Sequence, residues 1–375
     1  MKILQLGKAY PPVNLGGVEV VIQLLTEGLN NEQIQCDALG VNDKFAYSED
    51  DGKYGGKIFR TKLIAKKFST LLSFQLVRVL ARIWRNYDII HLHTPDPMAA
   101  LAIFVVRPRT KIVLHWHSDI LKQKIIYFFF KPLLNWIAKR ADAIIATSPN
   151  YVDDSFFLKK YNEKVVIVPI GIDVDVRPNS SINHNLAKLY DNRTIIFSLG
   201  RLAYYKGFEY LVQASKYLPE SIVIVIAGEG IERLKLEKII EIGDLANKVK
   251  LVGKISEIDK RWYFNNARLF ALSSIVKTEA YAIVQVEAMA YGLPIVSTRI
   301  KGSGVDWVNQ HQVTGITVPV ENAEAIANAI MEIDRDEVQY EAYQVNARER
   351  YRTKFTQKIM ITQIIGIYER LVYVD

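Results

Sequence analysis

Glu279 and Glu287 stand eight residues apart around the start of a predicted helix. We expect this helix to begin near Ile283 and to stop at Gly292 and Pro294, because neither glycine nor proline suits a helix interior. The first helical turn leaves N–H groups unpaired and carries the positive end of the helix dipole, which favours a phosphate. Carboxylates on either side can accept hydrogen bonds from sugar hydroxyls. Two glutamates at this spacing are, by themselves, more often a solvated face.

Two cations, Arg201 and Lys206, follow a predicted strand at Thr194–Leu199 and are bracketed by Gly200 and Gly207. Arginine can bind a diphosphate with its planar fork, and lysine can bind it as a point charge. Surface cations are common, so this pair alone is weak. Because both constellations occur in the same half of the chain, together they indicate a nucleotide-phosphate site.

A third candidate is Gly16-Gly17, between the predicted first strand and the first helix. Glycine lets the backbone approach a ligand, and a helix start favours an anion. Neither this segment nor Gly228-Glu229-Gly230 completes the dinucleotide pattern G-x-G-x-x-G, which disfavours a nicotinamide-dependent oxidoreductase. Two further interpretations of the chain are left open: a sugar-nucleotide epimerase and a catalytically silent binding subunit.

Two histidine pairs, His91/His93 and His115/His117, each lie on one face of a strand end. Such pairs can in principle hold zinc. With Cys36 as the single cysteine of the chain, we expect no zinc site. We interpret His91 and His115 as structural residues and His117 as the functional one.

Strands must position these residues, and short apolar runs alternate with helical patterns along the whole chain. The predicted strands are Lys2–Leu6, Gln35–Val41, Ile89–Leu92, Lys111–His115, Ala143–Thr147, Val165–Val168, Thr194–Leu199, Ile222–Ala227, Val249–Val252, Leu269–Leu272, Pro294–Ser297 and Gly315–Val318. This alternation predicts an α/β protein whose parallel sheets are covered on both faces. Ligands of such sheets bind beyond the carboxyl ends of the strands, where the candidates lie.

Twelve strands in one sheet would be unusual, and the series pauses at the polar stretch 178–193. We therefore predict two doubly wound, Rossmann-like domains facing a cleft. The first would comprise residues 1–172 and the second residues 173–355. A closing helix over residues 356–375 is expected to pack toward the N-terminal domain.

The net charge of +8 belongs entirely to the first 172 residues, which hold 23 Lys and Arg against 15 Asp and Glu. Residues 52–87 contain nine basic side chains and no acid, and residues 120–141 place Lys122, Lys124, Lys131, Lys139 and Arg140 beside aromatic residues. Such a face suits an anionic membrane surface, although an ordinary solvated face explains it equally well. We expect no nucleic-acid partner and no membrane span. The single cysteine favours the cytoplasm, with peripheral attachment to the inner membrane.

The ordered motifs resemble the retaining glycosyltransferases of family four, which have the GT-B fold. Glu279 and Glu287 match the E-x7-E motif of that family, and Gly200–Gly207 match its G-R-L…K-G segment. Residues 169–173 match its P-x-G-I-D signature, and Gly16-Gly17 match its glycine loop. Residues 91–97, 115–119 and 302–309 further resemble a subgroup that builds bacterial surface polysaccharides of the O-antigen or capsule type.

The resemblance implies a metal-independent hexosyltransferase that retains anomeric configuration, with an acceptor bound by residues 1–172 and the nucleotide sugar by residues 173–355. It places Arg201 and Lys206 on the diphosphate, Glu287 on the ribose, Glu279 on the transferred sugar and Lys254 beside the base. It also brings Gly16 and Gly17 over the phosphates, and His117 near the reacting carbon. The implied catalytic residues are His117, Asp119, Arg201, Lys206 and Glu279. The implied donor-binding residues are Gly16, Gly17, Arg201, Lys206, Lys254, Glu279, Tyr281, Ala282, Ile283, Val284 and Glu287.

The family usually carries E-G-F-G before the helix, whereas this chain has Glu279-Ala280-Tyr281-Ala282. Methyl groups thus replace hydrogens where the backbone meets the donor. Asp173-Val-Asp175 spells the metal motif of a different glycosyltransferase fold, but it precedes the expected linker, and we predict no metal cofactor. The subgroup suggests GDP-mannose as donor and a glycan or a lipid-linked oligosaccharide as acceptor.

Overall fold

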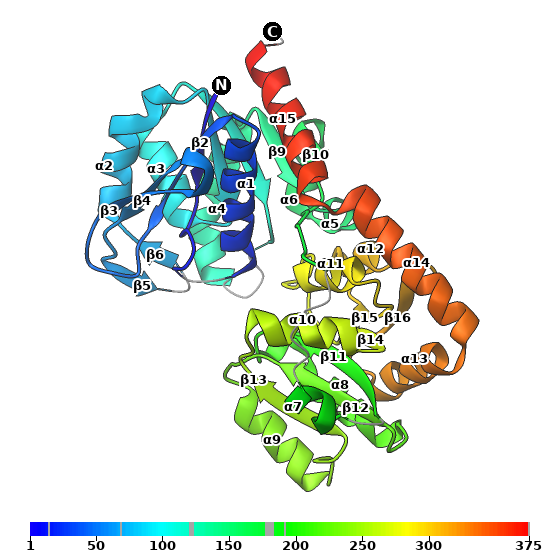
Figure 1. Ribbon diagram of the computed structural model, residues 1–375. Coiled ribbons are helices and arrows are strands. Elements are labelled where there is room, and N and C mark those ends of the chain that lie inside the picture. The colour runs from blue at the N-terminus through cyan, green and yellow to red at the C-terminus, as the bar shows by residue number, and fades with distance from the viewer. Residues whose placement is uncertain (14–15, 68–69, 120–123, 177–183, 191–192, 374–375) are drawn as a thin grey trace. The chain divides into compact units, whose positions relative to one another are not determined.

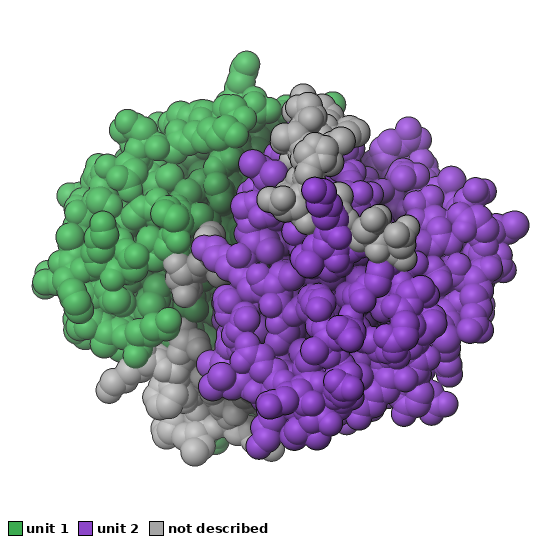
Figure 2. Space-filling view, turned by 60° about the horizontal axis from the view of Figure 1, so that its bottom comes forward, with its two compact units in different colours: residues 1–171, 357–375 green, residues 172–356 purple. Residues whose placement is uncertain are grey.

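The computed structural model describes residues 1–13, 16–67, 70–119, 124–176, 184–190 and 193–373. The chain forms two compact units (Figure 2): unit 1 comprises residues 1–171 and 357–375, and unit 2 comprises residues 172–356. The chain passes between the units next to the expected boundary at 172. The polar stretch 178–193, where the linker was expected, lies partly outside the described residues.

Unit 1 is built on an eight-stranded sheet with the order β10-β9-β8-β7-β1-β2-β4-β3. Its strands are β1 (Lys2–Leu6), β2 (Gln35–Val41), β3 (Ser48–Asp51), β4 (Lys57–Thr61), β7 (Ile89–Thr94), β8 (Lys111–Trp116), β9 (Ala143–Ala146) and β10 (Val165–Ile167). All pairings are parallel except that of β3 with β4. β5 (Ala65–Lys67) and β6 (Thr70–Leu72) form a separate hairpin. The chain reverses its direction of winding between β1 and β7.

The helices of unit 1 are α1 (Gly17–Asn31), α2 (Phe74–Ile83), α3 (Pro97–Val106), α4 (Lys124–Arg140), α5 (Pro149–Asp154), α6 (Phe156–Lys159) and α15 (Gln357–Tyr373). α2 packs against α3, and α3 packs against α4. The closing helix α15 lies along α1 (Figure 1), which confirms that it returns to the N-terminal unit. Its buried stripe of Met360, Ile361, Ile364, Ile367 and Tyr368 supplies the apolar face that holds it there.

Unit 2 has a six-stranded parallel sheet with the order β13-β12-β11-β14-β15-β16. Its strands are β11 (Thr194–Leu199), β12 (Ile222–Ala227), β13 (Val249–Gly253), β14 (Leu269–Leu272), β15 (Ile295–Arg299) and β16 (Gly315–Pro319). Its helices are α7 (His184–Leu189), α8 (Phe208–Ala214), α9 (Arg233–Ile242), α10 (Glu257–Asn266), α11 (Ile283–Ala290), α12 (Val305–Val308), α13 (Ala323–Arg335) and α14 (Glu337–Lys354). α8, α9 and α13 bury the main core of this unit against the sheet. Here the winding reverses between β11 and β14, as in other doubly wound sheets.

The predicted fold class is confirmed, and each of the twelve predicted strands is present. The prediction missed β3, β4, β5 and β6, which lie in residues 48–72. These strands are short, and β3, β4 and β5 are rich in charged residues. Few of their side chains are buried, such as Ile58 and Thr61 of β4 and Leu71 of β6. Their polar composition hid the strand signal, so a segment interpreted mainly as a basic face is in part sheet.

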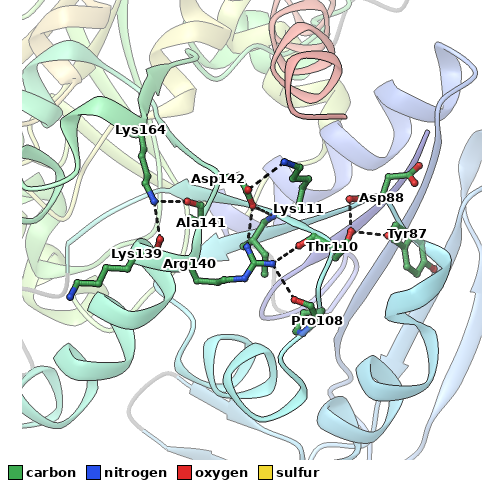
Figure 3. A network of polar contacts seen from close by, with 11 residues as sticks. Tyr87, Asp88, Pro108, Thr110, Lys111, Lys139, Arg140, Ala141, Asp142 and Lys164 are labelled. Atoms are coloured by element: carbon green, nitrogen blue, oxygen red, sulfur yellow. Dashed lines mark hydrogen bonds and ion pairs between the residues drawn. The ribbon is translucent and has the colours of Figure 1, made fainter. Parts of the chain in front are cut away.

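Part of the basic excess of unit 1 is structural. Figure 3 shows Arg140 at the end of α4, where its guanidinium contacts the carboxylate of Asp142 at 3.2 Å and donates to the carbonyls of Pro108 and Thr110. Lys164 donates to two further carbonyls in the same region, at 2.8 Å each. The guanidinium of Arg140 therefore binds the segments before β8 and β9, and we do not count it as part of a membrane-binding surface. Lys122 lies outside the described residues.

Candidate functional site

The reversal between β11 and β14 places two loops side by side at the carboxyl edge of the unit 2 sheet. The loop after β11 carries Arg201 and Lys206, and the segment after β14 carries Glu279. The helices α8 and α11 leave in opposite directions along the sheet, toward β12 and β15. A crevice opens where strand order reverses, which is where α/β sheets bind their ligands.

Gly207 allows the two loops to touch. Its φ of +60° lies in the left-handed region, and a Cβ there would lie 2.2 Å from the carbonyl oxygen of Ser273. Gly228, with φ of +137°, packs equally closely, because a Cβ would lie 1.9 Å from the oxygen of Gly200. The Gly228-Glu229-Gly230 segment after β12, which does not complete the dinucleotide pattern, thus packs against the start of the loop that carries Arg201 and Lys206.

Lys206 and Glu279 form an ion pair that is almost entirely buried, with side chains 8% and 10% exposed. The hydroxyl of Ser274 donates to the same carboxylate oxygen of Glu279 at 2.9 Å. The ammonium of Lys206 also lies 5.6 Å from the ring centre of Tyr205. The structure therefore brings together Lys206, which was predicted to bind the diphosphate, and Glu279, which was predicted to bind the transferred sugar.

A set of buried hydroxyl groups fixes the backbone around this pair. Ser273 donates to the carbonyl of Lys206 at 3.0 Å, Thr298 to that of Ser274, and Ser303 to that of Glu279. Sequence reasoning missed these residues. Their signal was available, since Ser273-Ser274 and Ser297-Thr298 are small polar residues at the ends of predicted buried strands, and such residues need internal partners.

Arg201 and Lys254 remain exposed. The guanidinium of Arg201 has no ion-pair or hydrogen-bond partner within the part of the chain that the structure describes. Lys254 directly follows β13, two strands away from β11 along the same sheet edge. Both cations are thus open to solvent at the edge where the ion pair is buried.

Helix α11 begins at Ile283, as predicted, with Val284 in its first turn. The residue before it, Ala282, is left-handed, with φ of 61° and ψ of 74°, and makes no side-chain cap. Tyr281 is buried, and its ring meets the edge of Phe355. The backbone thus adopts at Ala282 a conformation that suits glycine, the residue the family usually has there.

Glu287 lies on the second turn of α11, as predicted, and its carboxylate is 24% exposed. Its partner is Lys260 of α10, at 3.7 Å, a residue that sequence reasoning did not single out. Burial raises the pKa of Glu287, and the neighbouring ammonium of Lys260 opposes that shift. Glu287 thus has one cationic neighbour and keeps some access to solvent.

In unit 1, Gly16 is the N-cap of α1 and Gly17 its first residue. A Cβ on Gly16 would lie 2.7 Å from a carboxylate oxygen of Glu19, which is buried in the first helical turn. The predicted glycine loop is therefore closely packed on its own helix. Asp96, two residues after the end of β7, is the N-cap of α3. Burial raises the pKa of its carboxyl to about 6.

Four histidines are buried in one cluster: His91 and His93 of β7, His115 of β8, and His117 directly after β8. His91 contacts His115 at 3.2 Å between ring nitrogens, and His93 contacts His117 at 2.9 Å. Gln5 of β1 lies 2.9 Å from His93, and Tyr368 of α15 contacts His91. The cluster arises because parallel register places Gln5 beside His91 and His93 beside His115, so that these side chains share a face.

Among the described residues, His91, His93 and His115 form a group with nitrogens within 4.8 Å of one another, close enough to consider a metal ion. The ring of His93, however, lies nearly parallel to those of His91 and His115, with planes 19° and 22° apart, and the planes of His91 and His115 are 40° apart. Parallel rings do not aim their lone pairs at a common point, as tetrahedral zinc requires. Both nitrogens of His91 and of His93 also have protein partners. The donor set therefore fits hydrogen bonding better than metal ligation.

Asp119, the second catalytic candidate of unit 1, accepts hydrogen bonds from the indole of Trp116 at 3.0 Å and the hydroxyl of Ser155 at 3.1 Å. Its backbone N–H donates to the hydroxyl of Tyr151. These contacts hold the chain where it leaves β8. His117, by comparison, is tied to the rest of the cluster through His93 and is 8% exposed.

Two family models match the chain: Glycosyltransferase Family 4 over residues 15–176, and Glycosyl transferases group 1 over residues 181–350. The chain is 30% identical to O-antigen chain mannosyltransferase C of Escherichia coli over 99% of both proteins. It is 29% identical to D-rhamnosyltransferase WbpZ of Pseudomonas aeruginosa, over 95% of this chain and 92% of that protein. The chain therefore belongs to glycosyltransferase family 4, and its resemblance to surface-polysaccharide enzymes is confirmed.

Solved structures share the fold. Sucrose-phosphate synthase from Thermosynechococcus elongatus has a TM-score of 0.80 over 100% of both chains, at 20% identity. Anabaena Alr3699/HepE in complex with UDP and glucose has a TM-score of 0.76 over 98% of this chain and 99% of that one, at 21% identity. These likenesses confirm the GT-B fold class.

The left-handed Ala282 generates a stability prediction. A Cβ in this region costs about 1–2 kcal/mol, so Ala282→Gly should raise the melting temperature of the protein by a few degrees. The control is Ala280→Gly, at a buried residue without positive φ, which should lower it, because glycine loses more entropy on folding. Differential scanning calorimetry compares the two variants. Equal destabilisation by both would show that Ala282 is not strained.

The histidine cluster generates a pH prediction. Burial lowers the pKa of His91 and of His117 to about 3, and those of His93 and His115 well below 6.5. The unfolded chain binds protons near pH 6.5 while the folded cluster does not, so unit 1 loses stability as pH falls from 7 to 5. Each histidine contributes up to about 1.4 kcal/mol per pH unit. Burial raises the pKa of Asp96 to about 6, so its carboxyl binds a proton in the folded state as pH falls to 5. This proton offsets the loss of stability that about one histidine causes.

Hydrogen exchange, corrected for intrinsic rates, should therefore show that β7 and β8 lose protection between pH 7 and 5. Peptides from β11 and β12 of unit 2 serve as the internal control. Replacing His115 by glutamine should flatten the pH dependence by about one proton. Unchanged protection of β7 across this range would contradict the neutral cluster.

Proposed function

We propose that this glycosyltransferase moves a mannosyl group from GDP-mannose to a glycan or lipid-linked acceptor in the synthesis of a bacterial surface polysaccharide, with retention of anomeric configuration. The observation that carries the proposal is the buried Lys206–Glu279 pair at the strand reversal, with exposed Arg201 in the same loop. A diphosphate needs positive charge, and a sugar needs acceptors for its hydroxyls. This site offers both the positive charge and the hydrogen-bond acceptors, because the loop that carries Arg201 and Lys206 contacts the segment that carries Glu279.

The nature of the sugar is supported by the relatives. One matching protein is named a mannosyltransferase and another a D-rhamnosyltransferase. D-rhamnose is 6-deoxymannose, so both names refer to sugars of the manno configuration. Alr3699/HepE, in complex with UDP-glucose, shows that a protein of this fold takes a nucleotide sugar. We therefore place mannose first among the donors, and guanosine as its nucleoside.

The proposed chemistry is mostly positioning and charge stabilisation. Arg201 and Lys206 would stabilise the departing diphosphate, assisted by the first N–H groups of α11 at Ile283 and Val284. Glu279 would hold sugar hydroxyls and Glu287 the ribose, while Lys254 would lie beside the base. The acceptor hydroxyl would attack on the face from which the diphosphate leaves, and the leaving phosphate would take its proton.

Unit 1 would serve the acceptor. We assign His117 to the acceptor hydroxyl, with Asp119 shaping the chain beside it, and Gly16-Gly17 to the donor phosphates. No metal is required by this scheme, because two cations and a helix start supply positive charge to the leaving group. Metal independence is thus part of the proposal.

We further propose that the helical face of unit 1 binds an anionic membrane. A hollow of about 680 Å³ is lined by Lys62, Arg78 and Arg82 together with Phe74 and Ile64. The Phe74 side chain is 70% exposed. Exposed apolar residues continue onto the adjoining helices α3 and α4, including Val105 and Phe128. In the described residues no helix is long and apolar enough to cross a bilayer, so contact would be peripheral.

The donor site predicts the effect of removing its cations. Arg201→Ala and Lys206→Ala should each lower kcat/KM about 10²–10³-fold, as expected when one transition-state donor is lost. Lys216→Ala, at an exposed lysine of unit 2, is the control and should retain full activity. Initial rates of GDP-mannose consumption with a lipid-linked acceptor measure this. Full turnover by either variant would exclude that residue from the site.

Lys206→Ala also leaves Glu279 buried without its partner, which can destabilise the fold by about 3–5 kcal/mol. The double variant Lys206→Met/Glu279→Gln removes both charges together and should fold normally. If that variant melts like the wild type yet has no activity, loss of chemistry is separated from loss of folding.

The membrane surface predicts salt-dependent binding to anionic vesicles. The double variant Phe74→Ser/Arg78→Glu should reduce co-flotation with phosphatidylglycerol vesicles several-fold, because it removes an apolar anchor and reverses a charge. Ile231→Ser/Lys238→Glu is the matched control in unit 2, with Lys238 on α9 and Ile231, which is 90% exposed, two residues before that helix. Binding that is absent, or that persists unchanged in high salt, would contradict this surface.

A further inference from the structure

The histidine cluster contains two hydrogen-bonded chains that meet at one side chain, Gln5. Gln5 lies on the central strand β1 and is fully buried. Its amide oxygen contacts Nε2 of His93 at 2.9 Å, and its amide nitrogen donates to the hydroxyl of Tyr368 at 3.4 Å and contacts Sγ of Cys36 at 3.7 Å. Proton positions along the chain through His93 therefore follow from the orientation of this amide.

The first chain runs from Gln5 to His117. An amide oxygen only accepts, so the contact with His93 requires a proton on Nε2 of His93. Burial keeps His93 neutral, which leaves its Nδ1 as an acceptor. The 2.9 Å contact between His93 Nδ1 and His117 Nε2 then requires the proton on Nε2 of His117. Because His117 is also neutral, its Nδ1 carries a lone pair.

The second chain links Gln5 to the other two rings. Tyr368 accepts from the amide nitrogen of Gln5, and its hydroxyl contacts Nδ1 of His91. Nε2 of His91 lies 3.2 Å from Nδ1 of His115, whose Nε2 is buried without a partner in the described part of the chain. Because a hydroxyl can accept two hydrogen bonds as well as donate one, the Gln5 amide leaves the direction of this second chain open. The amide orientation therefore assigns the tautomers of His93 and His117.

We propose that Gln5 and His93 are positioning residues that hold His117 in the Nε2–H tautomer and leave its Nδ1 as the lone pair offered to the acceptor hydroxyl. The inference rests on the proposed function for the role of His117, but the tautomer itself does not. Near-parallel stacking fixes the ring further, because the plane of His117 lies 10° from that of His93 and 13° from that of His115. A ring held on its Nε2 side and stacked on two neighbours cannot flip freely.

The direct test is nitrogen-15 NMR of protein labelled at histidine. The chain has only six histidines, so each ring can be assigned from single His→Gln variants. Long-range proton–nitrogen spectra at pH 7 should show His117 protonated at Nε2 and bare at Nδ1. A bare Nε2 with a protonated Nδ1 would mean that the Gln5 amide is reversed, and would overturn the proposal.

Variants then test whether Gln5 sets the tautomer. Gln5→Met removes the acceptor at similar volume, and the His117 signals should become a mixture of tautomers. Gln5→Glu keeps an acceptor and should preserve the Nε2–H form. Tyr368→Phe cuts only the second chain and should leave His117 unchanged. A His117 tautomer that stays pure in Gln5→Met would show that Gln5 does not hold it.

Kinetics link the tautomer to turnover. Gln5→Met should lower kcat about tenfold or more, because a misoriented acceptor hydroxyl reacts more slowly. It should leave the KM for GDP-mannose unchanged, because the partners of Gln5 are Cys36, Tyr368 and His93 and include no residue assigned to the donor. Gln5→Glu should recover most of the rate. If the tautomer mixes but kcat is unchanged, the positioning role is overturned. If the wild type has the Nε2–H tautomer but transfers no sugar, the proposed function fails while the tautomer assignment holds.

Discussion

The candidate site of unit 2 depends on one interaction, the buried ion pair of Lys206 and Glu279. Taking two charges out of water costs several kcal/mol per ion, and an apolar pair of similar volume would often stabilise a fold as well. Here Ser274 and the carbonyl contacts of Ser273 and Ser303 hold the pair in place. Because this interaction is costly and lies where the strand order reverses, we propose that it serves a charged ligand rather than stability.

Unit 1 is organised by a different constraint, which is how to bury four imidazoles without leaving them charged. Neighbouring parallel strands supply the rings in register, and Gln5 and Tyr368 supply the outer partners. The closing helix α15 is therefore more than a cover, because its Tyr368 joins the N-terminal sheet to the last residues of the chain. Unit 2 thus places its candidate residues at the reversal of its sheet, between β11 and β14, and unit 1 places the histidine cluster on β7 and β8, next to the reversal between β1 and β7.

Sequence reasoning predicted what depends on periodicity and on short motifs. It located six of the eight strands of the unit 1 sheet, all six strands of the unit 2 sheet, the start of α11 at Ile283 and the loop carrying Arg201 and Lys206. It missed the short strands of residues 48–72, because their side chains are mostly outside the core. It also missed Gln5, Tyr368 and Lys260, since each acquires its role from a partner distant in sequence, such as Gln5 and Tyr368, which are 363 positions apart. The left-handed conformation of Ala282 was hidden for the same reason, although the departure from glycine had marked the position.

The central claim is that Lys206 and Glu279 form a metal-free site for a nucleotide sugar, and a thermal-shift comparison tests it most directly. Purified protein would be melted with GDP, UDP, ADP or dTDP and with their common sugars, with and without EDTA, beside the Glu279→Gln variant. A ligand that binds only the folded state raises the melting temperature. The account predicts that GDP and GDP-mannose each raise the melting temperature of the wild type by the same amount with and without EDTA. It also predicts that GDP-mannose stabilises the wild type more than GDP does, and that Glu279→Gln loses this difference while keeping the stabilisation by GDP. No shift with any diphosphate, or a shift that EDTA abolishes, would contradict it.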